Sequence, residues 1–385
     1  AYYGMKSDQK EYIMKLLKLQ LENFRSASRG TFEFDPTRPL TVIAGPNGLG
    51  KTNLLEAVYV LSLGRSFRAV LQDDLISWGM DYFRLIGEIE TKEKTEIEVS
   101  YSNYPSRKKI FKKNGAALKN SEYIGTFLTV LFHPEDLNIL YLSPSLRRRY
   151  MDILLSQADR RYLVALTKYN QILKQRNALL DEIRRARFAR APTSTLLDDL
   201  FAWDKEIVEF GSAIIEKRLQ LLSFLNQKLP KLYRAISGGK ETLTVSYLSK
   251  IEPPDSPAKL PGLYTQTLSN RMEKDILQAK TTAGPHRDDL AFYLNEKEIN
   301  VSASRGEFRT LLLAIKLAEI EFIRELTGED PILLLDDVFS ELDRSRQNRL
   351  LKAIKGCQAI ITTTDMETLG KLASESQHIN LAEVK

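Results

Sequence analysis

The sequence has one cysteine, three histidines and no long apolar run. A single cysteine, Cys357, excludes an intrachain disulfide framework and leads us to expect a reducing, cytoplasmic location. No stretch approaches the roughly 20 consecutive apolar residues of a membrane span, so we expect no membrane partner. His133, His286 and His378 lie far apart, so a zinc site is not expected, even where His286 stands beside Asp288 and Asp289.

A complete phosphate-loop motif stands near the front of the chain. It matches G-x-x-x-x-G-K-[ST] and reads Gly45-Pro46-Asn47-Gly48-Leu49-Gly50-Lys51-Thr52. The apolar run 40–44 before it is typical of a buried strand, and 53–61 has the apolar spacing of a helix. Because backbone amides and a helix N-terminus converge on an anion at such a turn, we predict that the chain binds ATP.

Each part of this motif has a chemical task. The glycines let the backbone approach the phosphates, Lys51 reaches the β and γ oxygens, and the Thr52 hydroxyl can bind Mg²⁺. Asn53, the next residue, is included among the predicted nucleotide contacts.

A second half of the site is predicted from a late apolar run, 332–335, which ends in two carboxylates. Asp336 is placed to hold Mg²⁺, directly or through water. Asp337, one residue later, is the predicted general base that polarises the attacking water.

Ser304 stands before a predicted amphipathic helix over 308–319, where it is either a plain N-cap or part of a nucleotide site. With Gly306 it resembles the S-G-G-Q signature of ABC-type ATPases, with Arg305 and Glu307 as departures. In those enzymes the signature of one protomer covers the γ-phosphate held by the other. The segment 339–343 resembles their D-loop, and Thr364, at the end of a predicted strand over 359–365, replaces their switch histidine.

The domain organisation follows from a change in pattern along the chain. Strand-like segments at 15–21, 31–34, 83–89 and 96–101 predict a mixed sheet around the phosphate loop. Heptad seams, interrupted by Arg176 and Lys217, predict two antiparallel helices joined at a proline turn at 191–194. We therefore expect an extension over 1–13, an ATPase head over 14–140, an inserted helical arm over 141–278 and the rest of the head over 279–385.

Motif order and several local blocks resemble one family. The order matches the head of SMC-like DNA-repair ATPases, and blocks such as 64–68, 132–137, 143–149 and 283–289 resemble the bacterial RecF family from about Met14 to the end. This resemblance implies an α/β, ABC-type P-loop ATPase head with an inserted antiparallel coiled-coil-like arm. It also implies ATP with Mg²⁺ as cofactors, a nucleotide contact from Arg25, an ATP-dependent homodimer, binding to double-stranded DNA near gap junctions, and action with RecO and RecR in loading RecA.

A polyanion partner is also indicated by charge. Residues 147–190 carry twelve Lys or Arg and four Asp or Glu, although a solvated helix surface is an equally good interpretation. The candidate DNA contacts are Arg65, Arg68, Arg147 and Arg148. A transport-type ABC subunit remains an alternative that DNA-stimulated ATP hydrolysis would distinguish. A nucleotide kinase is a further alternative, which predicts phosphoryl transfer to a small acceptor.

Overall fold

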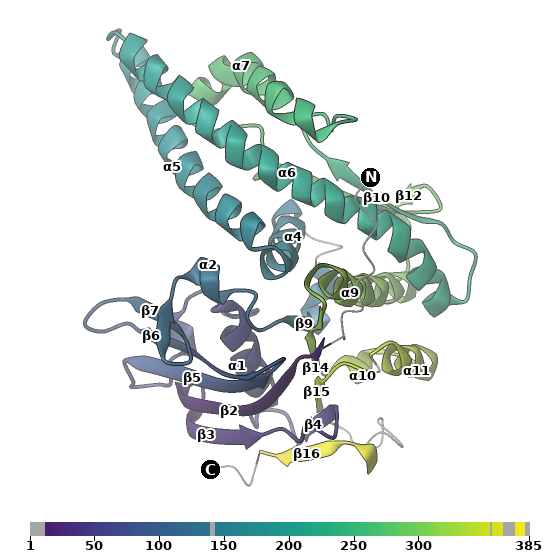
Figure 1. Ribbon diagram of the computed structural model, residues 1–385. Coiled ribbons are helices and arrows are strands. Elements are labelled where there is room, and N and C mark those ends of the chain that lie inside the picture. Colours follow the sequence, from purple (N-terminus) through teal and green to yellow (C-terminus); the bar gives the residue numbers. More distant parts are fainter. Residues whose placement is uncertain (1–11, 139–142, 355, 365–373, 382–385) are drawn as a thin grey trace. The chain divides into compact units, whose positions relative to one another are not determined.

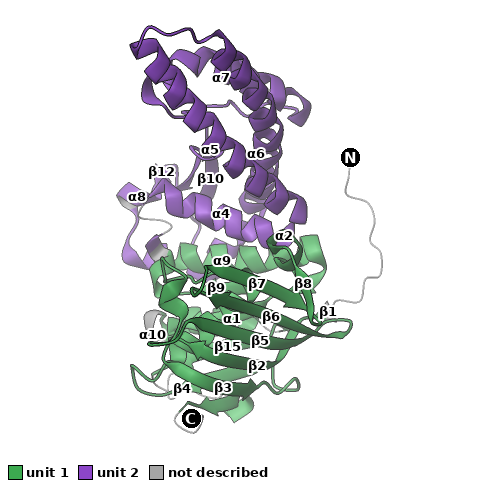
Figure 2. Ribbon diagram, turned by 90° about the vertical axis from the view of Figure 1, so that its left-hand side faces the viewer, with its two compact units in different colours: residues 1–137, 309–385 green, residues 138–308 purple. Residues whose placement is uncertain are grey.

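The computed structural model describes residues 12–138, 143–354, 356–364 and 374–381. The chain divides into two compact units, one of Ala1–Leu137 with Arg309–Lys385 and one of Asn138–Phe308 (Figure 2). Most of the expected extension, residues 1–11, lies outside the described residues. None of the helices in the described ranges is long and apolar enough to cross a bilayer.

The first unit contains a six-stranded antiparallel sheet in the order β3-β2-β5-β6-β7-β8 (Figure 1). Its strands are β2 (Lys15–Phe24), β3 (Ala27–Glu33), β5 (Tyr82–Glu90), β6 (Lys94–Ser102), β7 (Lys108–Lys113) and β8 (Ala116–Leu118). Alternating burial along β5 shows that one face packs inward, as the sequence pattern predicted.

The same unit contains a five-stranded parallel sheet in the order β16-β4-β15-β14-β9. Its strands are β4 (Leu40–Ala44), β9 (Thr129–Phe132), β14 (Ile332–Asp336), β15 (Ala359–Thr363) and β16 (Gln377–Asn380). The expected single mixed sheet is therefore wrong. In the first sheet, neighbours such as β5 and β6 are joined by a short turn and pair antiparallel. In the second, β14 and β15 are separated by helical segments and pair in parallel.

Helix α1 (Lys51–Leu63) contacts strands of both sheets. Every residue from Leu54 to Leu63 is buried, which is the pattern of a helix enclosed on all sides. Further short elements of this unit are β1 (Tyr12–Ile13), paired with β13 (Glu329–Asp330), the helices α2 (Asn120–Tyr123), α10 (Val338–Glu341) and α11 (Arg344–Ala353), and the 3₁₀ turns η1 (Asp73–Leu75) and η2 (Pro134–Leu137).

The second unit is built on an antiparallel helical hairpin (Figure 1). Its helices are α4 (Pro144–Ala158), α5 (Arg160–Phe188), α6 (Ser194–Ser237), α7 (Leu260–Gln278) and α8 (Ile299–Ser302), with η3 (Pro257–Lys259) and the sheet β10 (Leu243–Leu248), β11 (Asp289–Leu294) and β12 (Lys297–Glu298). The predicted proline turn joins α5 to α6, and α6 runs through Pro230 to Ser237. Helix α7 was not predicted, because Pro261 and Gly262 gave its first turn the composition of a loop.

The two seams meet around buried arginines. Arg176, which we expected to interrupt its seam, is 0% exposed and pairs with Asp204 at 2.6 Å and Asp275 at 2.9 Å. Arg218 is buried in place of the neighbouring Lys217 and pairs with Asp152 at 2.8 Å. Ion pairing with aspartates is what allows these charges to be buried, although Arg176 Nη2 has no hydrogen-bond partner among the described residues.

The compact units differ from the expected domains at their second boundary. We expected the head to resume at Ala279, but 279–308 cluster with the second unit. The reason is that β11 pairs along its whole length with β10, which follows α6. Helix α9 (Arg305–Thr327) then crosses the boundary between the units.

Candidate nucleotide-binding site

The carboxyl ends of the parallel strands bring distant motifs together. The register aligns Ala44 with Thr363, Thr362 with Asp336, and Leu335 with Phe132. Because all these strands are parallel, the residues that follow them gather at one edge of the sheet. The phosphate loop, the acidic pair and the segment after β9 therefore lie side by side.

The phosphate loop has the backbone geometry that its glycines permit. Gly48 and Gly50 have φ of 88° and 90°, in the left-handed region, and α1 begins directly after Gly50. The buried Lys51 ammonium donates to the carbonyls of Gly45 at 2.5 Å and Pro46 at 2.9 Å. These neutral oxygens hold the cation over the loop without neutralising it, so its charge remains available for phosphate.

Thr52 and Asp336 meet directly in the structure. The Thr52 hydroxyl donates to Asp336 Oδ1 at 3.0 Å, and the Thr362 hydroxyl donates to the same oxygen at 2.7 Å. Hydroxyl and carboxylate oxygens are the donor set that Mg²⁺ prefers, so Thr52 and Asp336 fit this ion. Asp337 follows with φ of 50°, and its amide donates to the Thr362 hydroxyl at 3.0 Å.

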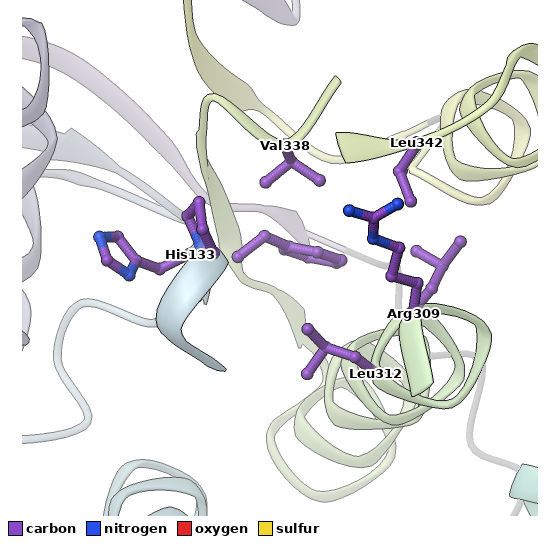
Figure 3. A pocket seen from close by; sticks show the side chains of 8 residues that line it. His133, Arg309, Leu312, Val338 and Leu342 are labelled. Atoms are coloured by element: carbon purple, nitrogen blue, oxygen red, sulfur yellow. The ribbon is translucent and has the colours of Figure 1, made fainter. Parts of the chain in front are cut away.

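Sequence reasoning missed His133, which it considered only as a possible zinc ligand far from His286 along the chain. Its Nε2 lies 3.4 Å from Asp336 Oδ2 because β9 pairs with β14. Figure 3 shows a pocket beside it, close to the end of β14. The pocket is lined by Phe132, His133, Pro134, Arg309, Leu312, Leu313, Val338 and Leu342. Only the strand register, which single-sequence patterns do not specify, could have revealed this neighbour.

Arg25 lies in an ionic cluster on the first turns of α1. The buried Glu56 carboxylate accepts from Arg25 at 2.7 and 2.8 Å, from Arg68 at 2.8 Å and from Ser66 at 2.5 Å. Burial alone would raise the pKa of Glu56, but these hydrogen bonds outweigh it and lower the pKa. Arg68 also donates to Asn53, so both arginines are held beside the phosphate-loop helix.

The four candidate DNA contacts therefore have different environments. Arg68 belongs to the Glu56 cluster, and Arg65 is partly exposed. Arg147 is 6% exposed and its guanidinium binds Asp289 through two hydrogen bonds, of 2.7 and 2.8 Å. Its expected DNA contact is wrong, because a buried, paired guanidinium cannot reach a phosphate. Arg148 is partly exposed and donates to the Asp288 carbonyl at 2.8 Å.

Ser304 forms a capping box with Glu307 at the start of α9. The Ser304 amide and hydroxyl donate to Glu307 Oε2 at 2.6 and 2.7 Å, and the Glu307 amide donates to the Ser304 hydroxyl at 3.3 Å. Ser304 is exposed, and the adjacent Gly306 is half-buried. The N-cap interpretation accounts for this geometry, and an incoming anion would meet the Glu307 carboxylate here.

The D-loop-like segment lies in the first unit and is held in place by α11. Gln347 donates to the carbonyls of Phe339 at 2.7 Å and Leu342 at 2.9 Å, and Arg346 donates to the Thr310 hydroxyl on α9 at 2.8 Å. The predicted strand ends at Thr363 with Thr364 exposed, and Asp365 lies outside the described residues.

The loop containing His286, Asp288 and Asp289 is a structural centre of the second unit. His286 Nδ1 lies 2.6 Å from the Tyr169 hydroxyl and Nε2 lies 3.0 Å from the Thr281 carbonyl, while Asp288 accepts from Tyr247 at 2.6 Å. No group of three potential metal ligands occurs within the ranges that the structure describes. These three side chains are engaged separately, since Asp289 is bound by Arg147.

We expect His286 to make the protein less stable in mild acid. Burial lowers the pKa of His286 from 6.5 to about 4, and the charges of Arg287, Arg148 and Arg176 add to this effect. Between these two pH values the unfolded chain is protonated at His286 and the folded chain is not. The contribution of His286 to the free energy of unfolding is therefore fully present above pH 6.5 and is lost as the pH falls towards 4. Between pH 7.5 and 5.5 the expected loss is about 1 kcal/mol. Urea unfolding of the protein and of His286→Gln at both pH values measures it, and an equal pH dependence in the variant would contradict the assignment.

These features define a P-loop ATPase head of the ABC type carrying a helical arm. The family model described as "RecF/RecN/SMC N terminal domain" matches residues 15–383. The DNA replication and repair protein RecF of Oceanobacillus iheyensis is 39% identical over 92% of this chain and 94% of the relative, and that of Streptococcus uberis is 38% identical over 97% and 100%. The chain belongs to the RecF family of DNA replication and repair proteins.

Solved structures agree with this assignment. The recombination mediator protein RecF with ATP in the RecFOR pathway superposes with a TM-score of 0.85 at 35% identity, over 93% of this chain and 94% of that one. The Smc head domain of Pyrococcus furiosus, at 18% identity over 94% and 92% of the two chains and a TM-score of 0.50, shares the fold.

Proposed function

We propose that this chain is an ATP-dependent DNA-binding protein of recombinational repair. Two copies bind ATP with Mg²⁺ between their heads, close on double-stranded DNA near single-strand gaps, and separate after slow, DNA-stimulated hydrolysis to ADP and phosphate. With RecO and RecR, the protein then assists the loading of RecA. The RecF-ATP and RecFOR descriptions of its structural relatives support ATP and these partners.

One observation carries the ATPase proposal, namely the contact of Thr52 with Asp336 at 3.0 Å across 284 residues of chain. It joins the phosphate loop to the acidic strand, and the proposed general base, Asp337, directly follows that strand. The exposed Ser304 supplies the half of the site that acts on the partner's nucleotide. When bound, Mg²⁺ neutralises charge on the β and γ phosphates, while Lys51 and Arg25 position the triphosphate.

The proposal is tested by measuring mass and DNA affinity together. Light scattering should show a monomer without nucleotide and a dimer with ATP and Mg²⁺. Electrophoretic binding to duplex, gapped and single-stranded DNA should be strongest for gapped duplex in the presence of ATP. A molecular mass that does not change with nucleotide would contradict the head-to-head dimer. A protein that binds none of the three DNA substrates would contradict the repair function.

We expect Glu307→Gln to strengthen the ATP-dependent dimer. The carboxylate occupies the position of the signature glutamine and accepts from Ser304, so it repels an approaching γ-phosphate and competes for the hydroxyl donor. Removing one like charge in a partly solvated site is worth about 1 kcal/mol, or about a fivefold lower dimer dissociation constant. Sedimentation velocity with ATP and Mg²⁺ measures the change.

Glu122→Gln is the matched control for this substitution. Glu122 is also the third residue of a capped helix, α2, and accepts from the Lys119 amide at 3.2 Å. It tests the loss of a capping carboxylate outside the signature. Equal effects of the two substitutions would show that Glu307 acts only through helix capping.

A further inference from the structure

Cationic side chains without carboxylate partners surround the loop 281–288 of the second unit. They come from α4, from the segment after β10, from α7 and from the loop itself, and form a set that we call the cationic cluster: Arg148, Lys250, Arg271, Lys274 and Arg287. Within the described part of the chain, none of the five forms an ion pair. Lys250, Lys274 and Arg287 are exposed.

The cluster is held in place by neutral oxygens. Four of its members donate to the loop, namely Lys250 to the Thr282 carbonyl at 3.0 Å, Arg271 to the Thr282 hydroxyl at 2.9 Å, Arg287 to the Thr281 carbonyl at 3.2 Å and Arg148 to the Asp288 carbonyl at 2.8 Å. Such bonds fix the direction of the side chains and leave their charge uncompensated.

Asp288, within the loop itself, is buried and accepts from the Tyr247 hydroxyl at 2.6 Å. The other carboxylates that act on the cluster are paired with arginines. Asp289 binds Arg147 at 2.7 Å, Asp152 binds Arg218 at 2.8 Å and Asp275 binds Arg176 at 2.9 Å. Each of these acids is committed to a buried arginine, because breaking such a pair would leave a charge stranded in the core. The surface charge of the cluster therefore remains positive.

The cations of the cluster also act on one another. Burial lowers the pKa of Lys250, and the charges of Arg271, Lys274 and Arg287 lower it further, while Asp275 opposes this shift without reversing it. A bound polyanion would relieve this repulsion.

We propose that the cationic cluster binds the sugar-phosphate backbone of duplex DNA. The inference deepens the proposed DNA-binding function and rests on it. Duplex DNA presents one charge per roughly 1.7 Å of helix axis, a density that several close cations can meet together. Guanidinium and ammonium groups held by a loop contact phosphate oxygens without reading bases, so the binding should be independent of sequence. An acidic protein segment is the competing occupant.

The test compares two triple variants with the same change in charge. Lys250→Gln, Lys274→Gln and Arg287→Gln neutralise the cluster, and Lys174→Gln, Lys205→Gln and Lys240→Gln neutralise exposed lysines elsewhere in the second unit. Binding to a fluorescent DNA duplex is measured by anisotropy in the presence of ATP at a series of salt concentrations. These measurements yield the slope of log affinity against log salt concentration. Each lost phosphate contact lowers the magnitude of this slope by about 0.9, so it should fall by about 2.7 in the cluster variant and hardly at all in the control.

Two controls test whether the variants are folded, namely thermal unfolding and the single variant Lys274→Gln. The exposed Lys274 has no hydrogen bond to the loop within the described ranges, so its substitution breaks no bond that holds the loop. The magnitude of the salt slope should fall by about 0.9. Unchanged slopes in both cluster variants, or a loss of affinity for poly-glutamate with DNA affinity intact, would overturn the inference. If the unaltered protein forms its ATP dimer but binds no duplex, the DNA-binding function itself fails together with this inference. Failure of the cluster alone would leave wild-type DNA binding intact.

Discussion

Lys51→Arg should abolish the ATP-dependent dimer. The Lys51 ammonium is buried and sits 2.5 and 2.9 Å from two loop carbonyls, a space that suits a compact ammonium and not a planar guanidinium. Loss of a charge-assisted contact to phosphate is worth about 1.5–3 kcal/mol, so the dissociation constant for ATP should rise about 10- to 100-fold. Calorimetric titration with ATP and Mg²⁺ measures affinity, and light scattering measures the dimer.

Lys94→Arg is the control for this change. Lys94 is an exposed lysine on β6, with a side chain 64% exposed, and it lies 3.4 Å from Glu88. It should leave affinity and mass unchanged. A Lys51→Arg protein that still dimerises with ATP would show that the lysine does not hold the triphosphate.

Asp337→Asn should separate binding from turnover. The residue has φ of 50°, a conformation that asparagine tolerates, so the backbone should be retained. Removal of a general base should slow hydrolysis by about 100-fold or more, while affinity for ATP changes little. The expected result is a dimer that persists for as long as ATP is present. Light scattering measures the dimer, and a phosphate-release assay measures hydrolysis.

Asp336→Asn provides the comparison. Asp336 accepts from Thr52 and Thr362 and is the predicted Mg²⁺ ligand, so its loss should weaken Mg²⁺-dependent nucleotide binding itself. If Asp337→Asn lowers affinity and turnover to the same extent as Asp336→Asn, Asp337 belongs to the metal site and another group acts as the base.

Local patterns predicted the elements of the nucleotide site well. The strand before the phosphate loop was expected over 40–44 and is β4 (Leu40–Ala44), and the acidic strand was expected to end in Asp336 and Asp337. Both succeed because an apolar run bounded by glycine, proline or acidic residues has few other folded forms. Helix α7 was not predicted because the Pro-Gly pair in its first turn is typical of a loop. The burial of Tyr264 and Leu268, which stabilises the helix, is known only from the packed structure.

Side-chain partners were the least predictable part of the site. Arg147 and Arg176 were assigned from their neighbours in sequence, the first to DNA and the second to a break in a seam, yet both are buried against aspartates. His133 was set aside for its distance along the chain and lies 3.4 Å from Asp336. An arginine carries the same charge in solvent and in a core, so its type does not disclose its partner.

The residues alone established the phosphate loop, the acidic strand, the helical hairpin and the RecF resemblance, because each depends on short-range spacing and on backbone preferences. The tertiary structure decided that the strands form two sheets, that His133 faces Asp336, and that unpaired cations gather around loop 281–288. Strand register and ion pairing join residues that are far apart along the chain. Their free energy depends on the packed core that brings those residues together, and no local pattern contains that information.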